Sequence, residues 1–298
     1  MATFIAFDIG GTKVKHSLLT EDGMVLEKCQ YDTSATDLHA FLSDMISTIA
    51  HYQSVHNVKG IGVSMPGFIN TETGYAETAG SVTALEGKNL KTILQDRVDL
   101  PVEIENDGNC VALAEMLNGN AQDSKNFICV TIGTGIGGGI VLNGDIVHGH
   151  SFRGGEFGFM VTQKNREGKD IWHHNGSTKS LIEAYKEWKG IDSDAKIEGQ
   201  VIFQEALHDE SVDALISDWL SYISCGIYNL AVTLNPEKIL IGGGVSVQEH
   251  LLERLEKQLE TLEFWENFRT PIVRCKHKND AGMLGALKHF LNKQSPKP

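Results

Sequence analysis

The stretch FDIGGTK, residues 7–13, decides the fold, because an apolar run ends there in a carboxylate and a pair of glycines. Phe4 to Ile9 is short and apolar, which predicts a buried strand, and Gly10 and Gly11 predict a tight turn directly after it. Backbone N–H groups that such a turn leaves free can bind phosphate oxygens. Because Asp8 lies beside the turn, the stretch predicts a phosphate-binding site at a strand end.

Two further strand ends carry the same kind of turn. TIGTGIGGG, residues 131–139, follows an apolar run, and LIGGG, residues 240–244, closes another. Strand-like and helical patterns alternate in the order β-β-β-α-β-α, and this order occurs twice, divided near residue 120. Such alternation predicts an α/β fold with a mixed sheet. We expect a small N-terminal α/β domain at residues 1–118, joined by the C-terminal helix at about 281–298, and a larger α/β domain at 119–280.

The composition excludes several classes of protein. The chain has 298 residues and a formal net charge of −13, which argues against a nucleic-acid partner because phosphate contacts need a basic face. No apolar stretch is long enough to cross a membrane, and the N-terminus lacks the pattern of an export signal, so we expect a cytoplasmic protein without a membrane partner. The five cysteines are scattered without CxxC spacing, which suits reduced thiols and indicates no cysteine-based zinc site.

The glycine turns indicate the class of phosphate site. Residues 133–138 match the pattern G-x-G-x-x-G, but a strand-like run follows, whereas a dinucleotide site needs a helix there. The turn after Asp8 and the turn Gly133–Thr134–Gly135 lie at matching places in the two halves. That layout is typical of two-lobed phosphotransferases, in which an aspartate such as Asp8 orients Mg²⁺ through water. The alternative is that these glycines serve only the packing of strands and turns.

These residues together resemble a known family. The matching motifs are Asp8–Ile9–Gly10–Gly11–Thr12–Lys13, Met65–Pro66–Gly67, Glu105–Asn106–Asp107–Gly108–Asn109, Gly133–Thr134–Gly135–Ile136–Gly137, Gly155–Glu156–Phe157–Gly158 and Gly242–Gly243–Gly244. In this order, over nearly the whole chain, they resemble the ROK family of sugar kinases, within the actin/hexokinase-like ATPases. The resemblance implies two RNase H-like domains with a cleft between them, and transfer of the γ-phosphoryl group of ATP to a sugar hydroxyl, typically O6 of a hexose.

The resemblance also implies roles for single residues. Asp107 looks like the general base, and Asn106 looks like a ligand of the sugar hydroxyls. The residues expected to bind ATP and its Mg²⁺ are Asp8, Gly10, Gly11, Thr12, Lys13, Thr131, Gly133, Thr134, Gly135, Gly243 and Gly244. Those expected to bind sugar are Gly67, Phe68, Thr78, Asn106, Asp107, Glu156, Phe159 and Glu183.

The chemistry of these side chains is consistent with the implied roles, and it leaves alternatives open. A sugar site needs both donors and acceptors; Asn106 supplies both, and Glu156 accepts. Asp107 precedes a helical pattern at residues 111–117, where a helix N-terminus favours an ionised carboxylate. Asn106 or Asp107 could equally be the N-cap of that helix. Lys13 could be a phosphate ligand or a surface lysine, and Glu183 could reach the sugar or only solvent.

The sequence departs from the family at one informative place. Most ROK proteins have a histidine where this chain has Phe159, and a cysteine cluster further on that binds structural zinc with it. Residues 171–185 contain no cysteine, so we expect no structural zinc, and the spacing of His148, His150, His173 and His174 matches no ordinary metal site. A phenylalanine cannot hydrogen-bond to a sugar. In both respects the chain resembles bacterial β-glucoside kinases, which phosphorylate O6 of the non-reducing glucose of cellobiose and similar β-glucosides.

Other functions stay open on the sequence. Glucokinases and N-acetylmannosamine kinases occur in the same family. ROK repressors carry a helix-turn-helix domain ahead of the kinase-like part, and here the first strand begins at residue 3, which favours a kinase. A non-catalytic sugar sensor is disfavoured by the joint presence of Asp107, Glu156 and both glycine loops. A homodimer is expected by analogy with the family alone.

Overall fold

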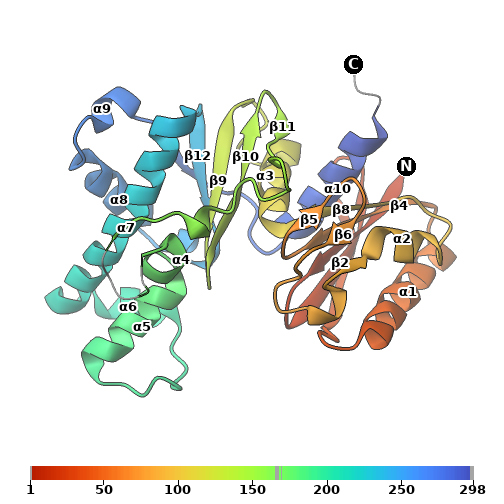
Figure 1. The fold of residues 1–298 in the computed structure, drawn as a ribbon, viewed down its shortest axis with the longest axis horizontal. Helices are drawn as coiled ribbons and strands as arrows, with labels where there is room; N and C mark the ends of the chain where they lie inside the picture. Colours follow the sequence, from red (N-terminus) through yellow and green to blue (C-terminus); the bar gives the residue numbers. More distant parts are fainter. Residues whose placement is uncertain (1, 165–167, 169, 296–298) are drawn as a thin grey trace. The chain divides into compact units, whose positions relative to one another are not determined.

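The computed structural model describes residues 2–164, 168 and 170–295, and the chain forms two compact units (Figure 1). The described residues of unit 1 are 2–123, 146–154 and 279–295; those of unit 2 lie within 124–145 and 155–278. The sequence-based division counted residues 146–154 with the second half, whereas their contacts place them in unit 1. None of the described helices is both long and apolar enough to cross a membrane.

Unit 1 is built on a five-stranded mixed sheet of order β3-β2-β1-β4-β8. Its strands are β1 (Thr3–Ile9), β2 (Lys13–Thr20), β3 (Val25–Asp32), β4 (Val58–Met65) and β8 (Val102–Asn106). The first three are antiparallel neighbours, and β1, β4 and β8 are parallel, so the last three end at one edge of the sheet. The other elements are α1 (Leu38–Val55), β5 (Ile69–Asn70), β6 (Tyr75–Ala76), η1 (Thr83–Leu85), β7 (Lys88–Asn89), α2 (Leu90–Gln95), α3 (Asp107–Asn118) and α10 (Ala281–Gln294).

The alternation of strand β1 sorts its side chains between two layers of helices. Phe7 packs with Met45 of α1 in one apolar core. Phe4 points the other way and lies 5.5 Å, ring centre to ring centre, from Phe290 of α10. Side chains two residues apart share a face of a strand, so Asp8 lies on the α10 side. The sequence of β1 thereby directs its one carboxylate toward the start of that helix.

Glycines let α10 lie directly against the sheet. A Cβ on Gly62 of β4 would be 2.4 Å from the carbonyl oxygen of Ala286, and one on Gly285 would be 1.9 Å from the carbonyl oxygen of Cys110 in α3. Real side-chain carbons do not approach backbone so closely, so both positions require glycine. The close approach holds α10 and α3 on one face of the sheet of unit 1.

Unit 2 repeats the strand arrangement, with the order β11-β10-β9-β12-β13. Its strands are β9 (Phe127–Ile132), β10 (Ile136–Leu142), β11 (Asp145–Ile146), β12 (Lys238–Gly242) and β13 (Ile272–Arg274), with β9, β12 and β13 parallel. Its helical segments are η2 (Phe157–Phe159), α4 (Trp172–Asn175), α5 (Thr178–Lys189), α6 (Gly199–Glu205), α7 (Glu210–Leu234), η3 (Gly244–Val247), α8 (Leu251–Glu260) and α9 (Trp265–Phe268). Figure 1 shows α5, α6 and α7 gathered in this unit. The predicted α/β fold with mixed sheets is confirmed.

Candidate functional site

Asp8 is held at the carboxyl end of β1 by contacts to both carboxylate oxygens. Ser64 Oγ donates to Oδ1 over 3.0 Å, and Lys15 Nζ donates to Oδ2 over 3.1 Å. Lys15 is opposite Asp8 in the β1–β2 register, and Ser64 is its neighbour in β4. A Cβ on Gly282 would lie 2.3 Å from Oδ1, so the start of α10 approaches the carboxylate closely, and a helix N-terminus favours negative charge.

The turn after β1 has the geometry of a phosphate-binding loop. Gly10 N donates to Lys13 O over 3.0 Å, and Thr33 Oγ1 donates to Gly10 O over 2.7 Å, which fixes the turn. Among the described residues, the N–H groups of Gly11 and Thr12 donate to no protein acceptor. Two backbone donors beside Asp8 are therefore available for phosphate oxygens.

Lys13, which the sequence left open as a phosphate ligand, points to the neighbouring strand. Its Nζ lies 2.6 Å from Asp32 Oδ1, and the two side chains are 43% and 85% exposed. The lysine that contacts Asp8 is Lys15, which the sequence analysis missed. Once the turn is known to include residues 10–12, Ile9 pairs with Val14 and Asp8 pairs with Lys15, so the length of the turn was the available signal.

Four expected sugar ligands meet at the carboxyl ends of β4 and β8. Gly67 has φ of +102°, and a Cβ there would lie 2.1 Å from the carbonyl oxygen of Thr78. Asn106 Nδ2 donates to Gly67 O over 3.0 Å, and Phe68 N donates to Thr78 Oγ1 over 3.0 Å. These bonds tie residues from distant parts of unit 1 into one cluster, with Phe68 half-buried in it. Gly67 is required for the close approach.

Residues 146–154 add a side chain to this cluster that the sequence analysis did not single out. The guanidinium carbon of Arg153 lies 4.8 Å from the centre of the Phe68 ring, within the range of a cation–π contact. The same guanidinium pairs with the carboxylate of Glu77. Arg153 therefore covers one face of an aromatic ring beside Gly67.

Asn106 and Asp107 lie at the junction of β8 and α3. Asn106 is the N-cap of α3, and its Oδ1 accepts from Asn109 N over 3.1 Å. The cap explains why the helix begins at Asp107, ahead of the apolar pattern at residues 111–117. Asp107 is exposed, and its Oδ1 accepts from Gly108 N over 2.8 Å. The capping alternative is thus realised by Asn106, while the Asp107 carboxylate faces solvent at a helix N-terminus.

A buried carboxylate lies directly before this pair. Glu105 is fully buried; its Oε1 accepts from Asn109 Nδ2 over 3.0 Å, and its Oε2 lies 2.7 Å from His148 Nε2 and 3.1 Å from His289 Nδ1. Burial alone would raise the pKa of Glu105, but the hydrogen bonds and charges of the two histidines outweigh it and hold the pKa well below its ordinary range. This network joins β8 to α10 and to residues 146–154, which explains why that segment belongs to unit 1.

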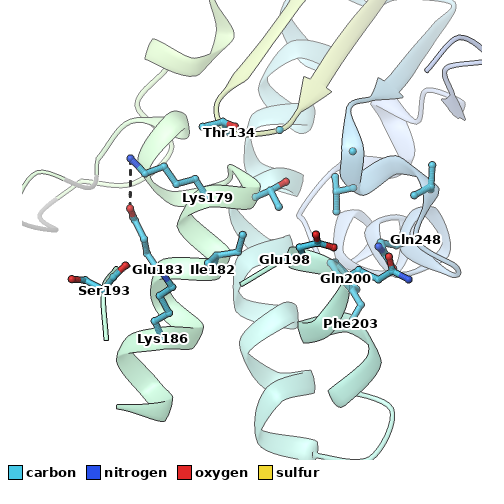
Figure 2. Close-up of a pocket in the computed structure, with 16 residues that line it drawn as sticks. Thr134, Lys179, Ile182, Glu183, Lys186, Ser193, Glu198, Gln200, Phe203 and Gln248 are labelled. Atoms are coloured by element: carbon cyan, nitrogen blue, oxygen red, sulfur yellow. Dashed lines mark hydrogen bonds and ion pairs between the residues drawn. The ribbon is translucent and has the colours of Figure 1, made fainter. Parts of the chain in front are cut away.

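Unit 2 contains a cavity of about 600 Å³ at the glycine loops (Figure 2). Its volume lies in the range of small-molecule sites, roughly 300–1,000 Å³. Figure 2 shows residues of α5 on one side and Gln200, Phe203 and Gln248 on the other. The lining residues are Gly133, Thr134, Thr178, Lys179, Ile182, Glu183, Lys186, Ser193, Glu198, Gly199, Gln200, Phe203, Gly244, Val245, Val247 and Gln248.

The loops of this cavity have the conformations that glycine permits. Gly243 has φ of +84°, and a Cβ on it would lie 2.2 Å from Ile132 O. A Cβ on Gly133 or Gly244 would meet nothing within 4 Å, so both backbones border open space. Thr131, at the end of β9, lies behind the loop, where its Oγ1 would be 3.2 Å from a Cβ on Gly137. The loops therefore expose backbone to the cavity.

Glu183 lies on the wall of the same cavity. Its Oε1 is 3.6 Å from Lys179 Nζ, one turn earlier on α5, and Figure 2 shows this pair. Both side chains are more than half exposed, so the pair contributes little to stability. The structure thus brings Glu183 together with Gly133, Thr134 and Gly244 rather than with the expected sugar ligands of unit 2.

Those ligands, Glu156 and Phe159, belong to the short helix η2. Glu156 is its N-cap residue and is partly buried, and this burial raises the pKa of its carboxyl group. Within the described part of the chain its carboxylate accepts no hydrogen bond. The Phe159 ring is 56% exposed and meets His173 edge-on, with the ring centres 5.1 Å apart. Phe157, between them, is buried in the core of unit 2.

Three of the four histidines considered as metal ligands contact protein groups. His148 contacts Glu105, His173 accepts from Ile136 N, and His174 Nδ1 lies 2.8 Å from Gly168 O. Across residues 2–164, 168 and 170–295, no group of three histidine, cysteine or acidic side chains is arranged to hold a metal ion. The expected lack of structural zinc stays a prediction.

The comparisons with known proteins agree with the motifs. The model of the ROK family matches residues 4–293. A β-glucoside kinase of Listeria monocytogenes is 37% identical over 97% of this chain and 98% of its own length. Among solved structures, the Lmo2764 protein of L. monocytogenes, described as a proposed N-acetylmannosamine kinase, has a TM-score of 0.90 at 36% identity and covers 98% of this chain and 100% of its own. A ROK family protein of Streptococcus pneumoniae TIGR4 in complex with sucrose has a TM-score of 0.88 at 31% identity, over 98% and 99% of the two chains.

These similarities cover at least 97% of this chain and at least 98% of each of the three relatives. They confirm the expected fold class, two RNase H-like units of the actin/hexokinase-like ATPases. They also identify the class of enzyme, an ATP-dependent carbohydrate kinase. The chain therefore belongs to the ROK family and, within it, resembles the β-glucoside kinases.

Proposed function

We propose that this kinase transfers the γ-phosphoryl group of ATP to O6 of the non-reducing glucose of β-glucosides such as cellobiose. The observation that carries the proposal is Phe159, whose exposed ring stands where the ROK motif has a hydrogen-bonding histidine. The similarity to a β-glucoside kinase supports it. The scattered free cysteines and the use of ATP suit a reducing compartment, which we take to be the cytoplasm.

The nucleotide occupies the cavity of unit 2 in this proposal. Apolar side chains on its walls, Ile182, Phe203 and Val245, suit a flat base. The backbone at Gly133 and Gly244 suits phosphate oxygens, because it borders the open part of the cavity. Glu183, on the wall of this cavity, then lies beside the nucleotide. The sugar contact that the family resemblance implies for Glu183 is the alternative to this role.

The chemical step needs a base and charge neutralisation. Asp107 accepts the O6 proton, O6 forms a bond to the γ-phosphorus, and the bond to the bridging oxygen breaks so that ADP leaves. The free N–H groups of Gly11 and Thr12 hold phosphate oxygens. Mg²⁺ neutralises charge on the phosphates when bound. Asp8 suits its hydration shell, because each carboxylate oxygen accepts from one protein donor, Ser64 Oγ or Lys15 Nζ, and so keeps accepting capacity.

The sugar ligands have limited hydrogen-bonding capacity left, which constrains how they bind. Asn106 already uses one N–H on Gly67 and one lone pair on Asn109 N, so one donor and one acceptor remain for hydroxyls. Because the Glu156 carboxylate accepts no hydrogen bond from the described residues, its acceptor sites remain for sugar hydroxyls. Phe68, held by Thr78, offers apolar surface to the C–H face of a pyranose.

Specificity follows from Phe159. A free reducing end carries a hydroxyl that requires a partner, whereas the aglycone of a β-glucoside presents a ring with apolar faces. The phenyl ring of Phe159 offers no hydrogen bond to a reducing-end hydroxyl, so it favours a substrate that carries an aglycone over one with a free reducing end. We therefore expect a higher kcat/KM for cellobiose than for glucose.

The second candidate is an N-acetylmannosamine kinase, because the Lmo2764 protein carries that description. An ATP-consumption assay across cellobiose, arbutin, glucose, mannose, fructose and N-acetylmannosamine separates the two. Activity confined to N-acetylmannosamine would defeat the β-glucoside proposal. No activity on any sugar, with intact binding of cellobiose, would favour a non-catalytic sensor.

Phe159→His tests the specificity argument within the same assay. The variant regains a hydrogen-bonding group worth about 0.5–1.5 kcal/mol, so the ratio of kcat/KM for cellobiose over glucose should fall by roughly 2- to 10-fold. Val161→His is the matched control, because Val161 is 61% exposed nearby in the chain and has no assigned role. An unchanged ratio in Phe159→His would remove the basis for the assignment.

A further inference from the structure

His173 links the glycine loop of unit 2 to the segment that carries Glu156. Its Nδ1 accepts from the backbone N–H of Ile136 over 2.9 Å, and Ile136 directly follows the loop Gly133–Gly135. The loop itself is closed by the bond from Gly133 N to Gly135 O, over 2.9 Å. A movement of the loop at Ile136 therefore moves or breaks the bond to His173.

The imidazole is enclosed by two glycines. A Cβ on Gly135 would lie 2.9 Å from Nδ1, and a Cβ on Gly158 would lie 2.1 Å from Cε1. Gly135 belongs to the loop, and Gly158 lies two residues after Glu156 in η2. The ring of His173 thus fills the space that side chains at Gly135 and Gly158 would occupy. The glycine loop and η2 therefore cannot come closer together without displacing this ring.

Phe159 supports the ring from the η2 side. Its ring meets His173 at 84° with centres 5.1 Å apart, the edge-to-face geometry that aromatic rings favour. The exposed phenylalanine therefore has a contact inside unit 2 besides any contact with substrate. Trp172, the preceding residue, is fully buried and fixes the start of α4.

The hydrogen bond from Ile136 N–H requires an unprotonated Nδ1, and hence a neutral ring, because the lone pair of Nδ1 is the acceptor. Burial of His173, and then the nearby charge of His174, lower the pKa of His173, which favours that neutral form. The acceptor role of Nδ1 therefore agrees with the neutral form of His173 that we expect near neutral pH.

We propose that His173 is a positioning residue that couples nucleotide binding at Gly133–Gly135 to sugar binding at Glu156. The coupling rests on the proposed function, which assigns the two ligands to these segments. Phosphate contacts order the loop, the ordered loop holds Ile136 N–H on His173, and the held ring fixes Gly158 and Phe159 and hence the backbone of Glu156. By reciprocity, sugar on Glu156 tightens the nucleotide by the same factor.

Titration calorimetry of the full chain measures this coupling. The probes are a non-hydrolysable ATP analogue with an imido group between the β- and γ-phosphates, and cellobiose. For the wild type, the Kd of the analogue should fall by about 5-fold or more when cellobiose is saturating. In His173→Leu, which cannot accept from Ile136, the ratio of the two Kd values should approach one. In His173→Asn, whose amide oxygen can accept that N–H, part of the ratio should return.

His174→Asn is the matched control. The neighbouring ring is exposed and contacts Gly168, so this variant should keep the wild-type ratio. Thermal unfolding of each variant separates a loss of coupling from a loss of fold, since a purely structural role would lower Tm without changing the ratio. A wild-type ratio of one, or a folded His173→Leu variant with the wild-type ratio, would refute the coupling. A wild type that binds neither probe would instead refute the proposed function.

Discussion

Lys15 Nζ lies 3.1 Å from Asp8 Oδ2, opposite it across the β1–β2 hairpin, whereas Lys13 pairs with Asp32 on the outer strand. The Lys15–Asp8 pair is partly shielded from solvent, and the Lys13–Asp32 pair is more exposed. Shielded charges interact more strongly than exposed ones. Lys15 is therefore the lysine that affects the electrostatics of Asp8 and of the glycine turn after β1.

Lys15→Met should lower kcat/KM for ATP more than Lys13→Met does. Loss of a charge-assisted hydrogen bond costs about 1.5–3 kcal/mol. We therefore expect kcat/KM for ATP to fall by roughly 10- to 100-fold in Lys15→Met. An exposed pair contributes about 0–1 kcal/mol, so Lys13→Met should change the value by about 5-fold at most. The measurement is initial-rate kinetics with ATP varied, and a larger loss in Lys13→Met would reverse the assignment.

Asp107→Asn should abolish most of the turnover without unfolding the protein. A general base contributes about 10²- to 10⁴-fold, so kcat should fall by that factor. The asparagine oxygen can still accept from Gly108 N, so Tm should change little. Asp99→Asn, at an exposed position of the same unit, is the control and should keep kcat. Undiminished turnover in Asp107→Asn would exclude it as the base.

Glu105→Gln should destabilise unit 1. The amide group that replaces one carboxylate oxygen would face His148 or Asn109, and an unsatisfied buried donor costs about 1–3 kcal/mol. Urea unfolding, followed by circular dichroism, measures the loss. Glu86→Gln, at an exposed site, should leave the unfolding curve unchanged.

The stability of Glu105→Gln should depend on pH differently from the stability of the wild type. The pKa of Glu105 is lowered from its ordinary value of 4.5, so its ionised form stabilises the fold above that pH. This contribution is lost as the pH falls through the lowered pKa of the folded chain. The stability difference between the wild type and Glu105→Gln should therefore be constant at neutral pH and shrink below about pH 4.5. A difference that grows on acidification would contradict the assigned ionisation.

Glu156→Gln should weaken sugar binding without lowering the stability of the fold. Burial raises the pKa of Glu156, so the ionised carboxylate opposes folding as the pH rises through its ordinary value and then through the raised one. The variant should therefore have an equal or higher Tm than the wild type at neutral pH, and this gain should vanish in acid. Its KM for the sugar should rise by about 10- to 100-fold, the cost of a hydrogen bond to a charged group.

Glu187→Gln is the control for the expected changes in Tm and in KM for the sugar. Glu187 is exposed near the end of α5, so neither Tm nor KM should change. A lower Tm for Glu156→Gln, or an unchanged KM for every sugar in the panel, would show that the Glu156 carboxylate has a structural role instead.

The sequence predicted the α/β fold because its signals are local. An apolar run that ends in glycine predicts a strand and a turn without knowledge of any partner, and the repetition of FDIGG and TIGTG indicated two similar halves. The same local patterns single out Asp8, Gly133 and Gly243 as candidate site residues. The motifs in their order are specific enough to indicate the family from the sequence alone.

Register and long-range packing were beyond local signals. Lys15 rather than Lys13 contacts Asp8 because the turn length sets which residues of β1 and β2 pair. The cap formed by Asn106 is a local contact to Asn109 N, whereas the second partner of Asn106, Gly67 O, is 39 positions away in the sequence and depends on the tertiary fold. Glu183 matched a motif of the family, yet the orientation of α5 places it on the wall of the cavity at the glycine loops of unit 2.

By itself, then, the sequence determined the strand-and-glycine framework and the residue types that phosphoryl transfer needs. Only the tertiary structure decided which side chains meet: Lys15 with Asp8, Glu105 with His148 and His289, and His173 with Gly135 and Gly158. The physical reason is that strands and turns follow from interactions between near neighbours in the chain. Contacts between segments far apart depend on register, on helix placement and on the space that glycines leave, which no short stretch of sequence encodes.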